Sequence, residues 1–339
     1  MNRVRFFQRV AAPNARPFII LAVTFAALAL ADLGFGTLLH TATIFSVTQL
    51  FATLGLAALG LGLTMIVDEF DLSIPGSFTV AGAVAVLTGV EYPWLGLACG
   101  VASGLAAGAI QGALIVSLGV RAVGLTLGGF LTLIGITYVL TGGSTIAYSN
   151  HSVSRWLYQP TFFGLISNRG LVVLAIFLLA AAILFFTRIG RDIIATGSNR
   201  AGAPVAGVNT SAIIIGVFSA AGGLAALGGV MLSYSLEAAS ATQLSDTLVA
   251  AASAAILGGV SLSGGKGRSL GIAAGVLTIC LLRSGLSAIG AKPYTLEIVT
   301  GTLLLVVAIF DAPRFMQQLR RLHGMLSRAA NRNTSESSV

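Results

Sequence analysis

Long apolar runs separated by short polar breaks make up most of this chain. Runs near 20 residues can cross a hydrocarbon core of about 30 Å as helices. We expect about ten such spans, near residues 18–31, 43–67, 74–90, 94–118, 122–140, 170–187, 211–234, 247–262, 269–289 and 294–310. The eighth run is short and rich in Ala and Gly, which favours a half-helix or re-entrant segment buried in protein. The pattern predicts an all-α integral membrane protein, a polytopic bundle of about ten helices.

Composition supports this fold class. The 339 residues are 56% hydrophobic and 9% charged, with a mean hydropathy of +0.94, whereas soluble domains carry about 25% charged residues. The net charge of +8 comes from basic residues at span ends and tails, so no nucleic-acid partner is expected. Cys99 and Cys280 both lie in apolar runs, which indicates neither a disulfide framework nor a metal site.

The distribution of basic residues predicts the topology. With a cytoplasmic N-terminus and ten spans, 15 of the 19 basic residues fall on the cytoplasmic side: Arg3, Arg5, Arg9, Arg16, Arg121, Arg188, Arg191, Arg200, Lys266, Arg268, Arg314, Arg320, Arg321, Arg328 and Arg332. Arg155, Arg169 and Lys292 fall outside, and Arg283 lies within a span. This asymmetry follows the positive-inside rule. It predicts cytoplasmic N and C termini.

Both ends of the chain need an interpretation. The first 17 residues carry four arginines before an apolar run that ends in Ala29-Leu30-Ala31, as in a secretory signal. Because the rest of the chain is polytopic, we expect a retained first span. Residues 1–312 then form the transmembrane domain. Residues 313–339 form a cytoplasmic tail that begins basic and amphipathic and ends disordered.

The longest polar segment in the middle of the chain covers residues 190–209. It is too polar for lipid and too short for a domain, and with Ala201, Ala203 and Ala206 it can form a short helix across the membrane face. It either receives motion from a soluble partner or is an ordinary cytoplasmic loop. The candidate polar contacts are Arg191, Asp192, Asn199 and Arg200. We name residues 190–209 the coupling loop.

Residues 68–76 hold three carboxylates and a Pro-Gly pair, so the second span stops there. The favoured interpretation is a turn in which Asp71 or Ser73 caps the third span, with Pro75 and Gly76 in its first helical turn. The alternative is a solute contact, since carboxylates at the membrane edge are rare and often functional.

Other polar residues within the spans are also candidates. Arg283 and Glu297 can pair across a hairpin near residues 290–293, or either can meet a polar solute. Gln49, Gln111 and Thr126 can bond solute hydroxyls or a neighbouring helix. The external segment 141–169 is rich in aromatic residues and suits an interfacial helix or a docking face. The glycines at 100, 104, 108 and 112 favour close helix packing.

No catalytic or nucleotide-binding constellation is visible. The three histidines are scattered, and no nucleophile–base pair can be assembled, so an enzyme is not expected. The turn 262–267 contains Gly264-Gly265-Lys266 but does not match a phosphate-binding loop, because the glycine spacing is wrong and no strand precedes it. We expect this chain to bind no cofactor and no ATP of its own.

Several motifs together resemble the permease subunits of ribose-type (carbohydrate uptake class 2) ABC importers, over residues 43–312. The strongest is the coupling loop, from Gly190-Arg191 to Asn199 and Ala206-Gly207-Val208. The others are residues 256–267, Pro293-Tyr294 with Gly301 and Asp311, Asp71-Leu72-Ser73, and Thr126-Leu127-Gly128. Asp68-Glu69, Pro75, Arg121-Ala122, Arg283-Ser284 and Leu296-Glu297 depart from the family's usual residues, so the solute can differ from ribose.

The resemblance implies a multi-pass permease of the bacterial inner membrane that imports a sugar or a related polar solute. It implies four partners: a separate ABC ATPase subunit that binds ATP with magnesium, a periplasmic solute-binding protein, a second permease copy or homologue, and membrane lipid. The coupling loop would contact the ATPase through Gly190, Arg191, Asp192, Gly197, Asn199, Arg200 and Gly207.

The solute path is expected to use polar and aromatic groups. The candidates are Gln49, Asp71, Ser73, Gln111, Thr126, Phe130, Arg283 and Glu297. An ion-coupled secondary transporter is the alternative function, and it would need a deep carboxylate such as Asp71 or Glu297. A receptor or scaffold is disfavoured because the external segments are small.

Overall fold

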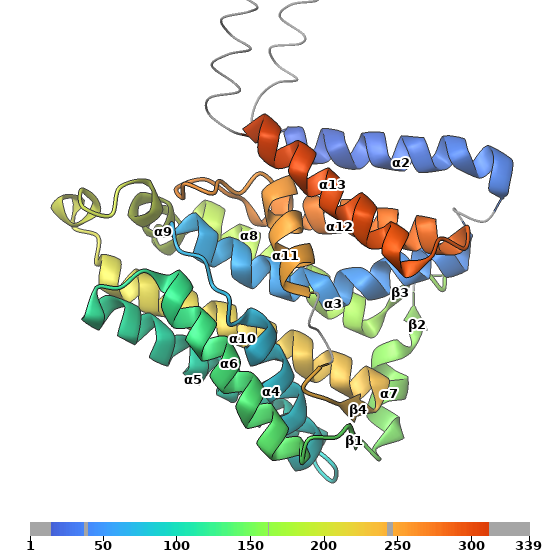
Figure 1. Cartoon of the computed structure of the whole chain (residues 1–339), viewed down its shortest axis with the longest axis horizontal. Coiled ribbons are helices and arrows are strands. Elements are labelled where there is room, and N and C mark those ends of the chain that lie inside the picture. Colours follow the sequence, from blue (N-terminus) through green and yellow to red (C-terminus); the bar gives the residue numbers. More distant parts are fainter. Residues whose placement is uncertain (1–14, 37–39, 162, 243–246, 312–339) are drawn as a thin grey trace, which may run out of the picture. The chain divides into compact units, whose positions relative to one another are not determined.

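The computed structural model describes residues 15–36, 40–161, 163–242 and 247–311 (Figure 1). The chain divides into two compact units, Met1–Leu296 and Glu297–Val339. The helices are α2 (Arg16–Phe35), α3 (Thr41–Ile66), α4 (Ile74–Thr88), α5 (Pro93–Leu118), α6 (Ala122–Thr141), α7 (His151–Tyr158), α8 (Asn168–Phe186), α9 (Arg188–Ser198), α10 (Thr210–Leu236), α11 (Thr247–Leu257), α12 (Ser269–Ala288) and α13 (Pro293–Asp311). A short 3-10 helix, η1, covers Ala203–Ala206. The predicted tail 313–339 and the arginines before residue 15 lie outside the described residues.

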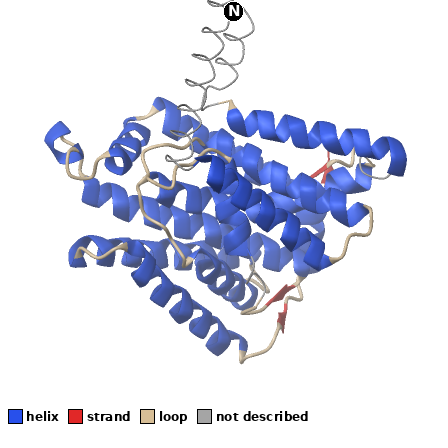
Figure 2. Ribbon diagram, turned by 45° about the horizontal axis from the view of Figure 1, so that its top comes forward, coloured by secondary structure: helices blue, strands red, loops and turns tan. Residues whose placement is uncertain are grey.

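Strands contribute little to the described residues. Two-residue strands form two antiparallel pairs, β1 (Ile146–Ala147) with β4 (Ala238–Ala239) and β2 (Pro160–Thr161) with β3 (Ile166–Ser167). Figure 2 shows them as short ribbons beside a helical body. The prediction of an all-α membrane protein is confirmed at this level.

An apolar helix occupies each predicted span. Within the described residues, seven are long and apolar enough to cross a membrane: α2, α3, α5, α6, α8, α10 and α12. The other apolar helices are α4, which has 15 residues, α11 and α13. The eighth run is the 11-residue α11, so the expected half-helix is present there.

Helices α3 and α10 form the centre of the first unit. Helix α10 packs on α4, α5 and α3, while α3 also packs on α8, α11 and α12 (Figure 1). The most apolar window of α3 is 67% buried, against 11% for α6. Helix α6 is little buried because it packs principally on α4 and α5 alone. Most of its surface is open to lipid or to a partner.

Glycines set the distance between α5 and α10. A Cβ atom on Gly104 or Gly108 would overlap a backbone carbonyl oxygen of α10, at Gly222 and Phe218 respectively. A Cβ atom on Gly222 would in turn overlap the carbonyl oxygen of Gly104. The backbones thus meet directly, as small residues allow where no hydrophobic effect drives association. The predicted packing role of the α5 glycines is confirmed.

One local prediction, the position of the helix in the coupling loop, is corrected. The helix of the coupling loop is α9, which begins two residues before the loop and ends before Ala201, Ala203 and Ala206. The Thr187 hydroxyl accepts a hydrogen bond from the Gly190 amide (3.3 Å) and caps its start. Ala203 and Ala206 lie in η1, which begins anew around Pro204, a residue that cannot continue the α9 hydrogen-bond ladder.

Gly108→Ala tests the α5–α10 contact. The added methyl group must push the two backbones apart, so the variant should lose about 1–3 kcal/mol of stability, measured as a lower midpoint of thermal unfolding in detergent. Gly216→Ala in α10 is the matched control, because a Cβ atom there has nothing within 4 Å. Equal midpoints for the two variants would contradict the close approach.

Candidate functional site

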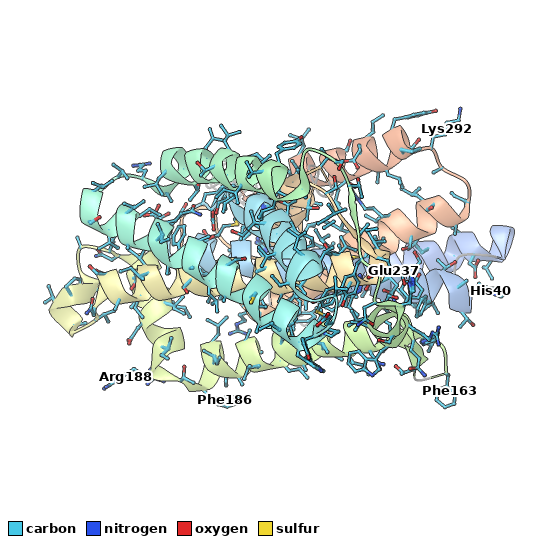
Figure 3. All side chains as sticks on the ribbon, turned by 90° about the horizontal axis from the view of Figure 1, so that it is seen from below. His40, Phe163, Phe186, Arg188, Glu237 and Lys292 are labelled. Atoms are coloured by element: carbon cyan, nitrogen blue, oxygen red, sulfur yellow. The ribbon has the colours of Figure 1, made fainter. Side chains whose placement is uncertain are left out.

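Four segments meet at what we call the coupling-loop end of the first unit. They are α9 with residues 199–200, the acidic segment 67–73 that links α3 to α4, the glycine turn 258–268 between α11 and α12, and the start of α6. Figure 3 places Arg188 and Phe186 at one end of the molecule and His40, Phe163 and Glu237 at the other. We name this second end the α7 end.

Helix α9 has a buried face and an exposed face. Gly190, Ile193, Thr196 and Gly197 are buried, whereas Arg188, Ile189 and Arg191 are exposed. Apolar and small residues three to four positions apart place one face on the protein. The other face presents basic and apolar side chains outward, beyond the helices that support it.

The C-terminal end of α9 is fitted against the end of α3 and the glycine turn. A Cβ atom on Gly197 would overlap the carbonyl oxygen of Ile66, and that oxygen accepts a hydrogen bond from the Gly265 amide (2.8 Å). Gly264 and Gly265 both have φ of +68°, in the left-handed region that favours glycine. A side chain at Gly265 would also collide with Ser198. Glycines therefore let three backbone segments meet without intervening side chains.

Glu69 joins the coupling loop to α6. Its Oε1 atom lies 2.6 Å from Nη1 of Arg200, and its Oε2 atom accepts a hydrogen bond from the Ala122 amide (3.1 Å). The Glu69 side chain is 8% exposed and that of Arg200 46%. Ala122 is the first residue of α6, where free amide groups and the helix dipole favour a carboxylate.

The acidic segment is fastened to α6 a second time. The Leu72 amide donates to Oγ1 of Thr126 (3.1 Å), a fully buried side chain one turn beyond Ala122. Asp71 is 1% exposed and accepts hydrogen bonds from the Ser73 amide (2.8 Å) and hydroxyl (2.6 Å). Burial raises the pKa of Asp71, and the two hydrogen bonds from Ser73 oppose that rise only in part.

The predicted cap of the third span is therefore wrong in detail. Ser73 occupies the N-cap of α4 but makes no side-chain capping bond. Its hydroxyl donates to Asp71 instead, and Asp71 holds the amide of Ser73 rather than one inside the helix. Pro75 and Gly76 do lie in the first turn of α4, as predicted.

The predicted solute-path residues fall in several places. Asp71, Ser73 and Thr126 lie together at the coupling-loop end. Gln49 lies about 25 Å away along α3, where its Oε1 atom accepts a hydrogen bond from Nη2 of buried Arg169 (2.7 Å). Gln111 on α5 is buried and faces Gly129 of α6.

The remaining path candidates are more exposed. Phe130 and Arg283 are half-buried in α6 and α12. Glu297 is exposed and belongs to the second unit, so its pairing with Arg283 stays a prediction. The solute-path role of all eight residues stays a prediction as well.

Aromatic and polar contacts hold the α7 end. Tyr148 stacks on Tyr234 of α10 with 4.5 Å between ring centroids, and its hydroxyl donates to the carbonyl oxygen of Gly89 (2.9 Å). The predicted interfacial helix in segment 141–169 is α7, with Trp156 and Tyr158 about half exposed.

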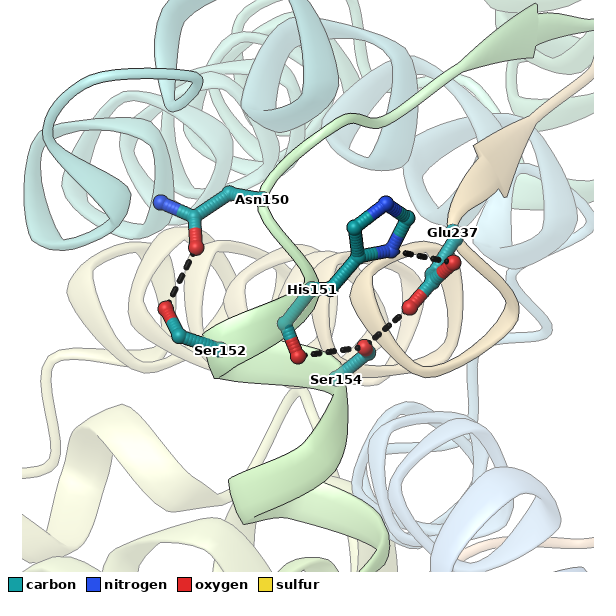
Figure 4. A network of polar contacts seen from close by, with 5 residues as sticks. All are labelled: Asn150, His151, Ser152, Ser154 and Glu237. Atoms are coloured by element: carbon teal, nitrogen blue, oxygen red, sulfur yellow. Dashed lines mark hydrogen bonds and ion pairs between the residues drawn. The ribbon is translucent and has the colours of Figure 1, made fainter.

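A polar cluster ties α7 to the end of α10 (Figure 4). Nδ1 of His151 lies 2.8 Å from Oε2 of Glu237, and the Ser154 hydroxyl donates to Oε1 of the same carboxylate. These two hydrogen bonds hold the pKa of Glu237 below its usual value, and the bond from Ser154 has the larger effect. An open pocket of about 400 Å³ lies beside the cluster, lined by His151, Ser154, Arg155, Tyr158, Ser235 and Glu237.

Sequence reasoning missed the joining role of Glu69, the packing role of Gly264 and Gly265, and the whole Glu237 cluster. A signal was present for Glu69, because an acidic residue beside a span and an arginine in the coupling loop were both expected on the cytoplasmic side. No local signal links Glu237 with Ser154, which lies 83 positions earlier.

Comparisons with known proteins agree on one family. The family described as "Branched-chain amino acid transport system / permease component" matches residues 43–308. The ribose import permease protein RbsC of Escherichia coli is 31% identical over 91% of this chain and 96% of its own length. The L-arabinose transport system permease protein AraH of Escherichia coli is 30% identical over 79% of this chain and 81% of its own length. The ribose import permease protein RbsC of Bacillus subtilis is 30% identical over 80% of this chain and 85% of its own length. No solved structure matches.

Acid should loosen the contact between α7 and α10. Because the folded pKa of Glu237 is lowered, the carboxylate stabilises the fold above its unfolded pKa of about 4.3, and this contribution disappears as the pH falls through the lower folded value. Between about pH 6 and pH 3, thermal unfolding in detergent should show a steeper loss of stability for wild type than for Glu237→Gln. Glu91→Gln, at an exposed carboxylate of the 89–92 turn, should behave as wild type. Parallel slopes for all three proteins would refute the assignment.

Proposed function

The chain belongs to the family of permease components of branched-chain amino acid transport systems, and we propose that it carries a sugar as the membrane subunit of an ATP-driven importer. It is a multi-pass transport subunit, not an enzyme. The observation that carries the sugar assignment is the similarity to ribose and arabinose permeases over most of the chain. The same similarity favours an ATP-driven importer over an ion-coupled secondary transporter.

The proposed topology has ten spans in the bacterial inner membrane, with both termini in the cytoplasm. Seven of these spans are the long apolar helices. In this proposal α4, α11 and α13 supply the other three, and α4 and α11 are shorter than a full span. The coupling-loop end faces the cytoplasm and the α7 end faces the periplasm. The location of basic residues supports this, since Arg121, Arg188, Arg191, Arg200, Lys266 and Arg268 all belong to segments of the coupling-loop end.

The coupling loop is the proposed contact with a separate ATPase subunit, which would bind ATP with magnesium. Together with the start of α9, its exposed surface combines charge with apolar area: Arg188 and Arg191 stand beside Ile189, which is 57% exposed, and η1 presents Val205, which is 91% exposed. Large exposed apolar side chains with neighbouring arginines are typical of protein interfaces. Among the expected contacts, Gly190 and Gly197 are buried and serve to seat α9.

The proposed transport cycle follows from how α9 is supported. ATP binding closes the ATPase pair and displaces α9, and the close contact of Gly197 with Ile66 passes that displacement to α3. A ligand on another subunit would thereby shift the permease between two states. A periplasmic solute-binding protein would deliver the sugar at the α7 end, and a second permease copy or homologue would complete the path. Gln49 would serve the outer part of this path, and Asp71, Ser73 and Thr126 the inner part.

Charge reversal tests the coupling loop. Arg191→Glu removes an exposed cation from the proposed interface and should reduce recovery of the co-expressed ATPase by roughly tenfold, measured by co-purification of the detergent-solubilised complex. Arg155→Glu is the matched control, because it reverses an exposed charge on α7 and should leave ATPase recovery unchanged. Equal recovery with both variants would contradict docking at α9. Sugar accumulation by liposomes holding this chain alone, driven by an ion gradient, would refute the importer.

A further inference from the structure

We propose that Glu69 is a positioning residue that transmits movement of the coupling loop to α6. This inference rests on the proposed function, because it assigns how an ATPase contact at α9 reaches a second transmembrane helix. The carrying observation is that each oxygen of one buried carboxylate has a different structural partner. Oε1 pairs with Arg200 of the coupling loop at 2.6 Å, and Oε2 accepts from the first amide of α6 at 3.1 Å.

The Arg200–Glu69 ion pair opposes separation of the coupling loop from the acidic segment. The carboxylate of Glu69 is largely shielded from water at 8% exposure, so its removal from Arg200 would leave a buried charge without its counter-ion. Breaking a pair in which one partner is shielded costs more than breaking a fully exposed one. When Arg200 moves with α9, the lower-energy response is therefore for Glu69 to follow.

Movement of Glu69 would be transmitted to α6. The acidic segment is held to α6 by the Glu69–Ala122 bond and again by the bond from Leu72 to Thr126, one turn further on. Two attachments on successive turns fix the direction of the segment relative to the helix, whereas a single bond would allow it to pivot. The acidic segment and the start of α6 thus form one mechanical body.

Helix α6 can shift in response to a pull on Glu69 with little change in its packing. It packs principally on α4 and α5 and is the least buried of the seven candidate spans after α2, so few contacts must change when it shifts. Its inward face carries Thr126, half-buried Phe130 and Thr137, whose hydroxyl lies 3.3 Å from that of Thr79 on α4. A shift of α6 would therefore change the side of the helix that holds two of the proposed solute contacts.

The two connections of α9 differ in kind. Gly197 meets the end of α3 through backbone contact, which resists compression but gives no attraction when α9 withdraws. The Arg200–Glu69 pair supplies that attraction toward α6. The coupling loop can thus push on α3 when α9 advances and pull on α6 when α9 withdraws.

The first test is carried out on the complete importer in proteoliposomes, with the ATPase subunits, the solute-binding protein and radiolabelled ribose or arabinose. Glu69→Gln keeps the side-chain shape but removes the charge, so the number of sugar molecules moved per ATP hydrolysed should fall about tenfold. Recovery of the ATPase should stay at the wild-type level. Asp68→Asn is the matched control, since Asp68 is the exposed neighbouring carboxylate, and it should leave this ratio unchanged.

A double-variant cycle separates transmission from simple stability. Arg200→Gln should lower the same ratio, and combining it with Glu69→Gln should lower it no further, because one link has been removed twice. Additive losses would overturn the proposal. So would a Glu69→Gln protein with a lower unfolding midpoint and a wild-type transport ratio, which is the result expected of a purely structural carboxylate.

The link itself can be measured on the permease alone, independently of any ATPase. Spin labels at Ser198→Cys and Val123→Cys, both exposed sites, in a chain with Cys99 and Cys280 replaced by Ala, report the distance between α9 and α6. We expect a narrow distribution for wild type and Asp68→Asn, and one at least twofold broader for Glu69→Gln. An unchanged width would overturn the transmission proposal. Failure of the wild type to bind an ATPase would instead refute the proposed function.

Discussion

Close backbone contact at glycines is the constraint on which this fold depends. Lipid tails are as apolar as the side chains of the helices, so helix association in a membrane needs dense packing and internal hydrogen bonds rather than the hydrophobic effect. Gly104 and Gly108 bring α5 against α10, while Gly197 and Gly265 bring α9 and the glycine turn against the end of α3. The same device therefore serves the core of the bundle and the seating of the coupling loop.

The two ends of the first unit are built differently. At the coupling-loop end, α9, the end of α3 and the glycine turn meet through backbone contacts, and the Glu69–Arg200 pair joins the coupling loop to the acidic segment. At the α7 end, the contacts are side-chain contacts: stacked Tyr148 and Tyr234, and the carboxylate of Glu237 held by His151 and Ser154. Backbone contact transmits displacement with little loss, whereas a polar side-chain cluster can open and re-form. This difference suits the roles proposed above, in which the coupling-loop end receives force and the α7 end admits a solute.

Sequence alone predicted the helices well, because a membrane span is a local property of composition and length. Even the half-helix α11 and the break near Pro75 were visible in it. Ala201, Ala203 and Ala206 favour a helix late in the coupling loop, but the Thr187 cap starts α9 earlier and a separate 3-10 turn forms around Pro204. The site was only partly predictable. Glu69 and Arg200 are 131 positions apart, and their pairing depends on how α3, α6 and α9 pack, which periodicity does not encode.

An ion pair with one buried partner is an uncommon choice for holding two segments together, since an apolar contact of similar size is often as stable. Its advantage here is direction. An apolar contact between α9 and the acidic segment could slide with little change in energy, whereas the Glu69 carboxylate has one position that satisfies both the Arg200 guanidinium and the Ala122 amide. The requirement to satisfy both partners keeps the distance between the coupling loop and α6 fixed. A connection of fixed length is what converts movement of a docked loop into movement of a helix, rather than into local deformation.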